Sequence, residues 1–420
     1  MNGNDRSILS ITMLGHGMVH MYELAIPIFI IAWSADLGVG SAMLGIAVAV
    51  GYALYGIGSV PSGIVTDAYG SKRALVICLL GMAVSFLALA AATGIVGVAL
   101  ALGLWGLAAS IYHPAGLRLI STGVTQRGVG FGYHGIAGNV GISLGPLAAA
   151  TLLIGFSWRV VAVAMAFPAF LAAVYTMYVS VDELAAVDPA SSTKATDGGS
   201  AGPSDGPEAT TDRLPSLGDV LGDTRTIFAG GFLIAFPMLI LEGFFYRGVL
   251  TFLPEMLAGY DSLATVTILG ESVEPSGYVF VGLLVIGMVG QYVGGRLSDA
   301  MAPEKAAVGA FLGLAAISVL FVPAANVGLL ALLLVSALLG FLLFAEQPLL
   351  QAIVADYSGS DVRGLSYGYM FLGVFGIGAL GAAFSGAVLA YTTQSVLFVL
   401  LAVVPFVAAV ISAVLWRRVA

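Results

Sequence analysis

Three ionisable side chains lie close together near the start of the sequence, at His16, His20 and Glu23. In a helix, spacings of four and three residues place all three on one face. Such a face can relay protons or bind a substrate, it can hold a transition metal through imidazole and carboxylate ligands, or it can be a buried polar cluster that joins helices. We favour the first interpretation. We expect no metal site, because no Cys and no His in the second half of the sequence completes a ligand set.

Two further histidines follow in the same half of the chain. His113 precedes Pro114, and a proline inside a helix frees a backbone carbonyl and can widen the helix toward a cavity. An imidazole there could share protons or bind an anion, or it could be satisfied by a neighbouring helix. For His134 we favour a structural role. With all four histidines in the first half, acid–base chemistry in the second half is left to carboxylates.

The second half places carboxylates and one arginine within apolar segments. Glu242 and Arg247 are five residues apart and therefore do not stack on one helical face. Arg247 holds the position in its half that Glu23 holds in the first, so the two could face each other across a central path and exchange their salt bridge for substrate or a proton. A static pair is the alternative, and Glu346 is a further coupling candidate. The predicted substrate or proton-coupling residues are His16, His20, Glu23, His113, Glu242, Arg247 and Glu346.

The rest of the sequence indicates what must position these groups. The chain has 420 residues, of which 59% are hydrophobic and 9% charged, whereas soluble proteins carry about 25% charged residues. A mean hydropathy of +1.03 and long apolar runs indicate a helical integral membrane protein, not an outer-membrane barrel. The sequence contains no nucleotide-binding glycine loop with a Lys and no catalytic-triad spacing, so we expect neither ATP use nor an enzyme.

Twelve apolar runs are long enough to span a bilayer. We expect an all-α membrane protein of twelve transmembrane helices in two pseudo-symmetric six-helix bundles, residues 1–180 and 225–420. A cytoplasmic disordered linker is expected at 181–224, where Asp, Glu, Ser, Thr, Gly and Pro replace the apolar residues. The predicted helices are 8–33, 41–66, 74–93, 95–120, 128–155, 160–180, 226–257, 277–299, 305–323, 327–355, 364–390 and 395–416.

The distribution of Lys and Arg predicts the orientation of the helices. With the N-terminus inside, thirteen of the basic residues fall at cytoplasmic ends or in cytoplasmic loops, Arg159 alone falls outside, and Arg247 lies within a helix. We therefore expect a multi-pass protein of the cytoplasmic membrane with both termini in the cytoplasm.

The two halves of the sequence repeat each other. Gly63-x-x-x-Asp67 recurs as Gly295-x-x-x-Asp299, and R-G-V-G-F-G-Y at 127–133 matches R-G-L-S-Y-G-Y at 363–369. Parallel repeats of six helices are typical of transporters that enclose a central path.

The segment G-I-V-T-D-A-Y-G-S-K-R at 63–73 resembles the loop 2–3 signature of the major facilitator superfamily, which latches the cytoplasmic side and permits its opening. Gly63 would allow close helix approach, Gly70 would support a tight turn, and Asp67 would meet donors from a neighbouring helix. The second copy has Ala302 and Glu304 in place of the second glycine and the first base. The implied latch residues are Gly63, Asp67, Gly70, Lys72, Arg73, Gly295 and Asp299.

The segment G-N-V-G-I-S-L-G-P at 138–146 resembles the fifth-helix motif of the superfamily's antiporters. Its glycines, Gly138, Gly141 and Gly145, would form a small-residue face that packs against a helix of the other half, with a kink at Pro146. Together with Y-H-P-A-G-L-R at 112–118, this segment is similar to the fosmidomycin-resistance-type branch of drug exporters.

The resemblance implies a secondary active transporter that moves a small molecule by alternating access of its two halves. We expect proton coupling and, from the fifth-helix motif, export of a drug or an organic anion by antiport. Uptake of an organic anion by symport and a non-transporting membrane sensor on the same fold are the alternatives. The expected partners are a small-molecule substrate, a coupling proton and the lipid bilayer. No cofactor and no nucleic acid is indicated, and we expect a monomer.

Overall fold

The structure is a computed structural model, and it describes residues 1–186, 217–268, 270–357 and 363–419. Within these residues, 12 helices are long and apolar enough to cross a membrane. The count predicted from the apolar runs is therefore confirmed. The spans are Gly3–Leu37, Ser41–Gly63, Ser71–Ala90, Ile95–Gly123, Arg127–Gly155, Trp158–Tyr178, Phe232–Ala258, Pro275–Ala300, Pro303–Ala325, Leu329–Asp356, Leu365–Tyr391 and Gln394–Arg418.

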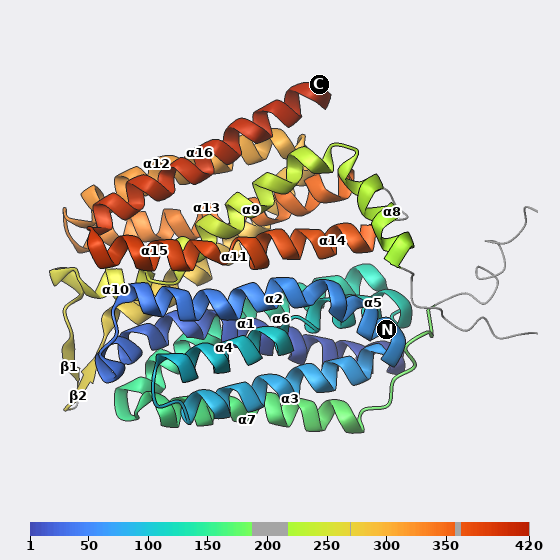
Figure 1. Ribbon diagram of the computed structural model, residues 1–420, viewed down its shortest axis with the longest axis horizontal. Helices are drawn as coiled ribbons and strands as arrows, with labels where there is room; N and C mark the ends of the chain where they lie inside the picture. The colour runs from blue at the N-terminus through green and yellow to red at the C-terminus, as the bar shows by residue number, and fades with distance from the viewer. Residues whose placement is uncertain (187–216, 269, 358–362, 420) are drawn as a thin grey trace, which may run out of the picture.

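The first half forms one bundle, drawn from blue to green in the lower part of Figure 1. Within it, α1 packs on α6, α2 on α4, and α3 on α7. The fourth span consists of two helices, α4 and α5. The helices are α1 (Gly3–Leu37), α2 (Ser41–Tyr69), α3 (Ser71–Ala90), α4 (Ile95–Ala109), α5 (Tyr112–Gly123), α6 (Arg127–Gly155) and α7 (Trp158–Tyr178).

The second half forms the other bundle, above the first in Figure 1. Here α11 packs on α13, and α12 on α16. A small antiparallel hairpin, β1–β2, precedes α11. The elements are α8 (Leu217–Phe228), α9 (Phe232–Leu250), α10 (Leu253–Ala258), η1 (Asp261–Leu263), β1 (Val266–Ile268), β2 (Glu271–Val273), α11 (Pro275–Ala300), α12 (Pro303–Ala325), α13 (Leu329–Asp356), α14 (Arg363–Phe371), the π-helical η3 (Leu372–Ile377), α15 (Leu380–Tyr391) and α16 (Gln394–Val419).

Two of the spans are interrupted where the sequence weakens a regular helix. The α4 helix ends at Ala109 and Ser110 follows as its cap, four residues before Pro114, whose ring would clash with that carbonyl in a continuous helix. The eleventh span passes through η3, whose sequence is L-G-V-F-G-I. Glycine costs helical stability, and π-helical turns occur often at functional sites.

The two bundles contact each other mainly through α2 against α15 and η3, and through α6 against α11. A methyl group added to Gly45 on α2 would meet the backbone of Ala382 on α15, and one added to Gly277 on α11 would touch Ala150 on α6. Both contacts lie toward the end of the bundle opposite the N-terminus. At the N-terminal end, Gly135 on α6 has nothing within 4 Å of an added methyl group.

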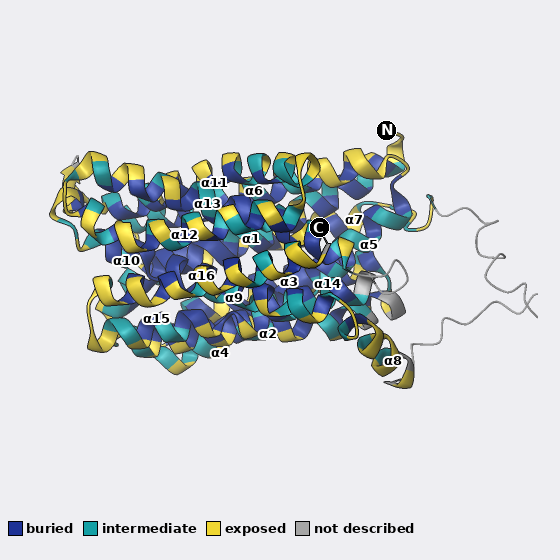
Figure 2. Cartoon of the chain, turned by 90° about the horizontal axis from the view of Figure 1, so that it is seen from above, coloured by how far each residue is buried: buried dark blue, intermediate teal, exposed yellow. Residues whose placement is uncertain are grey.

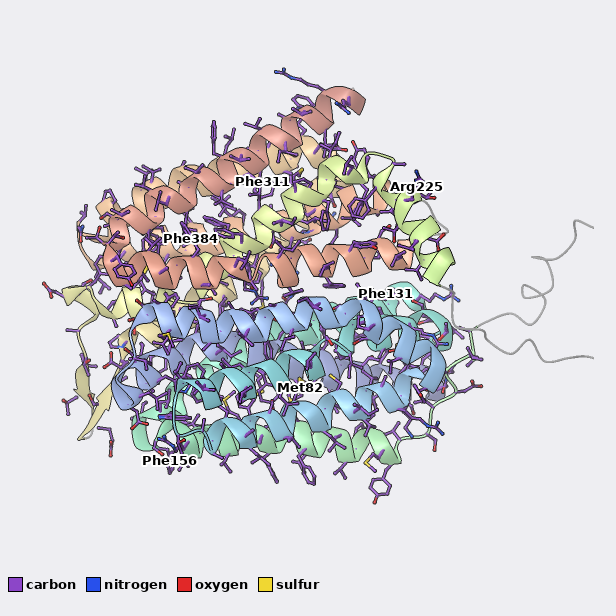
Figure 3. The ribbon with its side chains drawn as sticks, viewed as in Figure 1. Met82, Phe131, Phe156, Arg225, Phe311 and Phe384 are labelled. Carbon is purple, nitrogen blue, oxygen red and sulfur yellow. The ribbon has the colours of Figure 1, made fainter. Side chains whose placement is uncertain are left out.

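The outer surface of the bundle is apolar, as a bilayer requires. Figure 2 shows buried residues gathered in the interior and exposed residues on the outward faces of the helices. Leu100 and Leu330 are exposed by 71% and 72% on these faces, which in water would cost hydrophobic free energy. In Figure 3, Phe131 in the first turns of α6 lies near the N-terminal end of the bundle, and Phe156, the residue that follows α6, lies at the opposite end, so this helix crosses the bundle. The chain is a multi-pass membrane protein.

Most of the predicted linker, residues 187–216, lies outside the described residues. The structure describes the two flanks of this segment. The Asp182 amide donates a hydrogen bond to Asn4 Oδ1 at 2.8 Å, and Asn4 Nδ2 donates to the Asp182 carbonyl at 3.0 Å. At the other flank, α8 begins at Leu217, inside the range 181–224 that the sequence assigned to the linker.

Candidate functional site

All four histidines of the chain meet in one cluster inside the first bundle. His16 and His20 come from α1, His113 from α5 and His134 from α6. The His16 ring stacks on His134 with ring centres 3.8 Å apart and lies 5.4 Å from His113 and 4.7 Å from His20. The sequence predicted that His16 and His20 share a face, but not that the other two histidines join them.

Hydrogen bonds fix the orientation of the two α1 imidazoles. His16 Nδ1 donates to the backbone carbonyl of His134 at 2.7 Å. His20 Nδ1 lies 2.7 Å from Glu23 Oε2. The remaining ring nitrogens, His16 Nε2 and His20 Nε2, then face each other at 3.1 Å.

An ion pair joins the two bundles at the centre of the molecule. Arg247 Nη2 on α9 donates to Glu23 Oε1 on α1, and both side chains are buried. The guanidinium carbon lies 3.9 Å from the ring centre of Tyr52, 5.2 Å from that of Tyr246 and 4.8 Å from that of Phe375. The predicted pairing of Glu23 with Arg247 is thus present. The aromatic enclosure of the guanidinium was not predicted.

Two polar groups near this pair lack a partner. Arg247 Nε and the Tyr55 hydroxyl are buried and make no hydrogen bond among the described residues. Tyr55 stacks on Phe375 of the other bundle with ring centres 4.5 Å apart. The surroundings of the ion pair therefore contain hydrogen-bond donors that a bound solute can use.

A second pair of acidic groups lies in the other bundle. Glu242 on α9 and Glu346 on α13 are buried, with Glu346 0% exposed, and each carboxyl group lies in the electrostatic field of the other. Neither oxygen of Glu346 has a hydrogen-bond partner within the described part of the chain. A charged carboxylate in such surroundings would cost several kcal/mol, so Glu346 holds a proton while it stays buried.

Aromatic rings link the histidine cluster to the second bundle. His113 stacks on Phe371 of α14 with ring centres 4.7 Å apart and with nearly parallel planes. Its Nε2 is buried and makes no hydrogen bond among the described residues. The histidine cluster therefore contacts the second bundle through His113 and the ion pair through His20.

The structure describes part of the region around loop 2–3 in which the sequence predicts a latch. Gly70 lies between α2 and α3 with a φ of 87°, a backbone conformation that favours glycine. The Asp67 side chain lies outside what the structure describes, so its role stays a prediction. Gly63 and Gly295 have nothing within 4 Å of an added methyl group, so the expected close helix approach at Gly63 is absent here. Among the other predicted latch residues, Arg73 and Asp299 are exposed.

A residue that the sequence analysis missed completes this region. Glu183 accepts hydrogen bonds from the backbone amides of Ser71 at 2.8 Å and Lys72 at 2.9 Å, and it lies 3.7 Å from Arg118 Nη1. It thus caps the N-terminus of α3, where a negative charge is favourable. The signal available was an acidic pair directly after the sixth helix, on the same predicted side as Lys72.

In the second copy of the signature, Glu304 stands where the first half has a base. Its Oε1 accepts a hydrogen bond from the Tyr357 hydroxyl at 3.0 Å. Burial and this carboxylate raise the pKa of Tyr357 to about 12. In the second half, this tyrosine–carboxylate hydrogen bond therefore joins the start of α12 to the residue that follows α13.

The fifth-helix glycines do not pack against the other half, and this expectation is wrong. A methyl group on Gly138 would meet the His16 ring, one on Gly141 would meet the Gly17 carbonyl, and one on Gly145 the Met21 carbonyl, all on α1 of the same bundle. Small residues indicate a close approach but do not say to which helix. The repeat is preserved, because Gly381 meets the Phe244 carbonyl on α9 in the same way.

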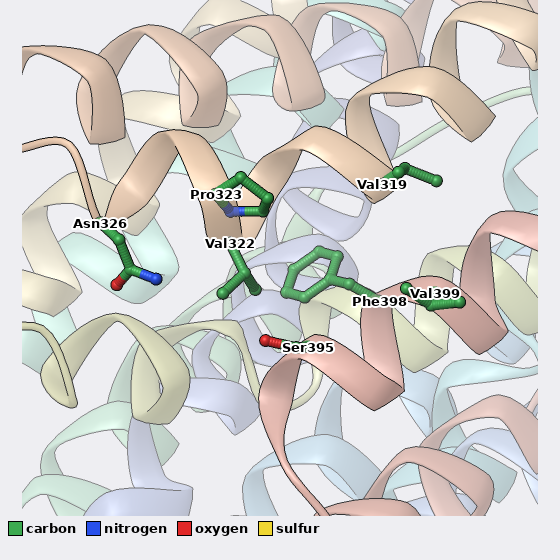
Figure 4. Close-up of a pocket in the computed structure, with 7 residues that line it drawn as sticks. All are labelled: Val319, Val322, Pro323, Asn326, Ser395, Phe398 and Val399. Carbon is green, nitrogen blue, oxygen red and sulfur yellow. The ribbon is translucent and has the colours of Figure 1, made fainter.

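A pocket of about 190 Å³ lies away from these groups, between α12 and α16 of the second bundle (Figure 4). Apolar side chains form most of its wall, together with Asn326 and Ser395. It contains none of the predicted site residues.

Comparison with solved structures identifies the fold. A bacterial homologue of the human lysosomal transporter Spinster, in an inward-facing and occupied conformation, is similar with a TM-score of 0.74 and 13% identity over 99% of this chain and 98% of that chain. The nucleoside transporter NupG is similar with a TM-score of 0.71 and 15% identity over 97% and 99%. A POT family transporter in complex with 5-aminolevulinic acid has a TM-score of 0.72 and 12% identity over 99% and 96%.

Comparison of sequences identifies the family. No curated protein sequence matches the chain. A family model described as Major Facilitator Superfamily matches residues 10–379 and 263–420, which together take in nearly the whole chain. The similarity to the fosmidomycin-resistance-type branch stays a prediction. The twelve spans, the two bundles and this match agree that the protein is a transporter, not an enzyme, and that the chain belongs to the Major Facilitator Superfamily.

Proposed function

We propose that this chain is a proton-coupled secondary transporter that exports a small organic anion by alternating access. The observation that carries the proposal is the buried ion pair between Glu23 of the first bundle and Arg247 of the second. A pair at this place must break or change partner whenever the bundles move apart around a central path.

An anionic substrate can take the place of Glu23 on the guanidinium. Removing one partner from a buried ion pair leaves an uncompensated charge and costs about 3–5 kcal/mol. A substrate carboxylate or phosphonate supplies the missing partner, and it can also accept a hydrogen bond from the free Arg247 Nε. Glu23 keeps His20 as its partner after the exchange.

Movement of the two bundles without substrate is disfavoured for the same reason. With Glu23 on Arg247, the two bundles are held together at the centre, and the aromatic rings of Tyr52 and Phe375 enclose the charge from both bundles. Only a solute that compensates Arg247 lowers the cost of separating the bundles. We therefore assign Arg247 as the anion anchor and Glu23 as the group that the substrate displaces.

The coupling proton is assigned to Glu242 and Glu346. Glu346 has no polar partner among the described residues, so it is stable inside the bundle as the neutral acid. Access of water from one side lets it release the proton, and closure of that side requires the proton to return. Because Glu242 interacts electrostatically with both Glu346 and Arg247, a change of charge at this pair acts on the anion anchor.

Export is supported by the resemblance of residues 138–146 to the antiporter motif of the superfamily. In antiport, the anion leaves the cytoplasm while a proton enters. Uptake symport uses the same residues but moves both solutes in one direction. The sign of the proton movement separates the two.

A proteoliposome assay tests the proposal. Vesicles that contain the purified protein and the pH dye pyranine, with the membrane potential clamped by potassium and valinomycin, receive fosmidomycin or phosphonoacetate outside. Antiport predicts that the lumen becomes more alkaline as the anion enters and protons leave. A lumen that becomes more acidic would indicate symport and overturn export, and no change relative to protein-free vesicles with either anion would count against the assigned substrate class.

Matched variants locate the two functions. Arg247→Lys should abolish the anion-dependent signal, because an ammonium group cannot bind a carboxylate or phosphonate in the bidentate way. Glu346→Gln should abolish the pH change while anion exchange across the vesicle continues. Arg159→Lys is the control, because Arg159 forms an exposed ion pair with Asp36 at the far end of the bundle.

A further inference from the structure

The two imidazoles on α1 present lone pairs to each other. His16 Nδ1 must be the donor to the His134 carbonyl, since a carbonyl oxygen only accepts. His20 Nδ1 faces the Glu23 carboxylate, which also only accepts while it is paired with Arg247. With both Nδ1 atoms protonated, the neutral rings have unprotonated Nε2 atoms, and these lie 3.1 Å apart.

Two lone pairs at this distance repel unless a cation lies between them. A proton can bridge two nitrogens, but the cluster contains a third. The ligand atoms of His16, His20 and His113 all lie within 4.8 Å of one another. The Nε2 atoms of His113 and His134 are both buried without a partner among the described residues, but only His113 belongs to this converging group. A bridging proton leaves His113 unsatisfied, whereas a metal ion can use all three nitrogens.

We propose that His16, His20 and His113 bind one divalent transition-metal ion of the zinc, cobalt and nickel class. Nitrogen ligands at about 2.0–2.1 Å from a tetrahedral ion lie about 3.3–3.4 Å apart, close to the 3.1 Å between His16 Nε2 and His20 Nε2. The ligand atoms of the three histidines lie within 4.8 Å of one another, so His113 must move toward the other two when the ion binds, by up to about 1.4 Å for the spacing that a tetrahedral ion sets. Imidazole suits these metals, and the absence of thiolates in the cluster disfavours the soft ions.

The surroundings of the two α1 ligands are those that metal-binding histidines need. Such a histidine donates its other ring N–H to a backbone carbonyl or a carboxylate, which fixes the tautomer and the ring orientation. His16 uses the His134 carbonyl and His20 uses Glu23. The hydrogen bonds around the cluster thus hold both Nε2 atoms ready for an ion.

The ligand set lies entirely within the first bundle. The sequence predicts no metal site because its second half offers no His or Cys, but the third imidazole comes from α5, which packs beside α1 in the first half. Three protein ligands leave a fourth position for water or a solute. The His20 side chain is 16% exposed, which leaves the ion a route into the site.

His134 offers a matched control within the same cluster. Its ring stacks on His16, yet it does not belong to the group of converging ligand atoms. His113 also stacks on an aromatic ring, Phe371. Replacement of either histidine by Phe preserves an aromatic ring, but only His113→Phe removes a ligand. The His134 carbonyl that orients His16 is a backbone group and remains in His134→Phe.

The test measures metal binding by the purified full-length protein, prepared through a histidine-free tag and placed in lipid nanodiscs. Co²⁺ is titrated and its visible absorption recorded, and Zn²⁺ is then added as a competitor. We expect one Co²⁺ per chain with the intense bands of a tetrahedral ion, displaced by Zn²⁺. We expect His134→Phe to bind like the original protein and His113→Phe to bind at least about tenfold more weakly.

Three results would overturn the proposal: no saturable binding by the original protein, unchanged binding by His113→Phe, or equal weakening by His134→Phe. Should His113→Phe fail to give a monodisperse protein, His20→Gln, at a partly exposed position, takes its place with the same expected weakening. The proposal goes beyond the proposed function. The metal test measures binding and requires no transport. A negative result for metal binding is therefore distinguishable from a negative result for anion–proton exchange in vesicles.

Discussion

Breaking the ion pair between Glu23 and Arg247 should lower the free energy of unfolding, because this pair connects the two bundles. In Glu23→Gln, Arg247 remains buried at 3% exposure without a counter-charge, and the expected loss in free energy of unfolding is about 3–5 kcal/mol. The aromatic rings around the guanidinium contact it already in the intact pair, so their cation–π attraction is present with and without the Glu23 carboxylate and does not offset this loss. Removing both partners in Glu23→Gln with Arg247→Met takes the uncompensated charge away. The double variant should therefore be more stable than Glu23→Gln alone.

The assay is a double-mutant cycle on the purified protein, with unfolding in SDS followed by tryptophan fluorescence. The coupling energy should be about 2–3 kcal/mol in favour of the pair. The control cycle uses Arg159 and Asp36, whose side chains are 39% and 47% exposed, so water and salt screen their attraction and the coupling should be far smaller. Additive effects of the Glu23 and Arg247 substitutions would refute the reasoning, because they would show that the two side chains do not stabilise each other.

Three further predictions concern the cap of α3, the packing of α6 and the buried acid. Glu183→Gln should lower stability by about 1 kcal/mol, because the amides of α3 lose a charged acceptor, and a thermal melt will measure it. Gly141→Ala should be clearly destabilising, since the methyl group would meet the α1 backbone; Gly135→Ala, which faces open space, should be neutral or slightly stabilising in the same melt. Glu346→Gln should preserve stability at neutral pH, because the amide replaces an already neutral acid; a large loss would show that Glu346 is charged when buried.

The spans and the repeat were predictable because they depend on local composition. A run of about 20 apolar residues can only cross the bilayer as a helix, and the paired signatures at Gly63 and Gly295 showed the two halves. The repeat register also indicated that Glu23 and Arg247 could face each other, and the structure pairs them. These features follow from spacing along the chain alone.

The features that could not be predicted depend on which helices become neighbours. The sequence places His113 beside a proline, but only the packing of α5 on α1 brings it to His16. The glycines of α6 indicated a close contact without naming its partner, and the expected partner was wrong. Glu183 lies far from Lys72 in the sequence, so their contact required the fold of the whole bundle.

Glu23 connects the polar groups of the two bundles. Its Oε2 is bound to His20, and its Oε1 accepts from Arg247. A cation on the imidazoles strengthens the attraction of Glu23 toward His20 and thereby weakens its hold on Arg247, whereas loss of the proton from Glu346 adds a negative charge on the Arg247 side. Cation binding thus acts on Glu23 from the His20 side, and proton loss from Glu346 acts on Arg247 from the other side. A transport cycle that involves both must therefore pass through a state in which Glu23 and Arg247 have separated. A variant that keeps them joined, such as one crosslinked between α1 and α9 at this level, should move no anion, and it should bind metal more weakly than the original protein because the coupling between metal binding and separation of the pair is reciprocal.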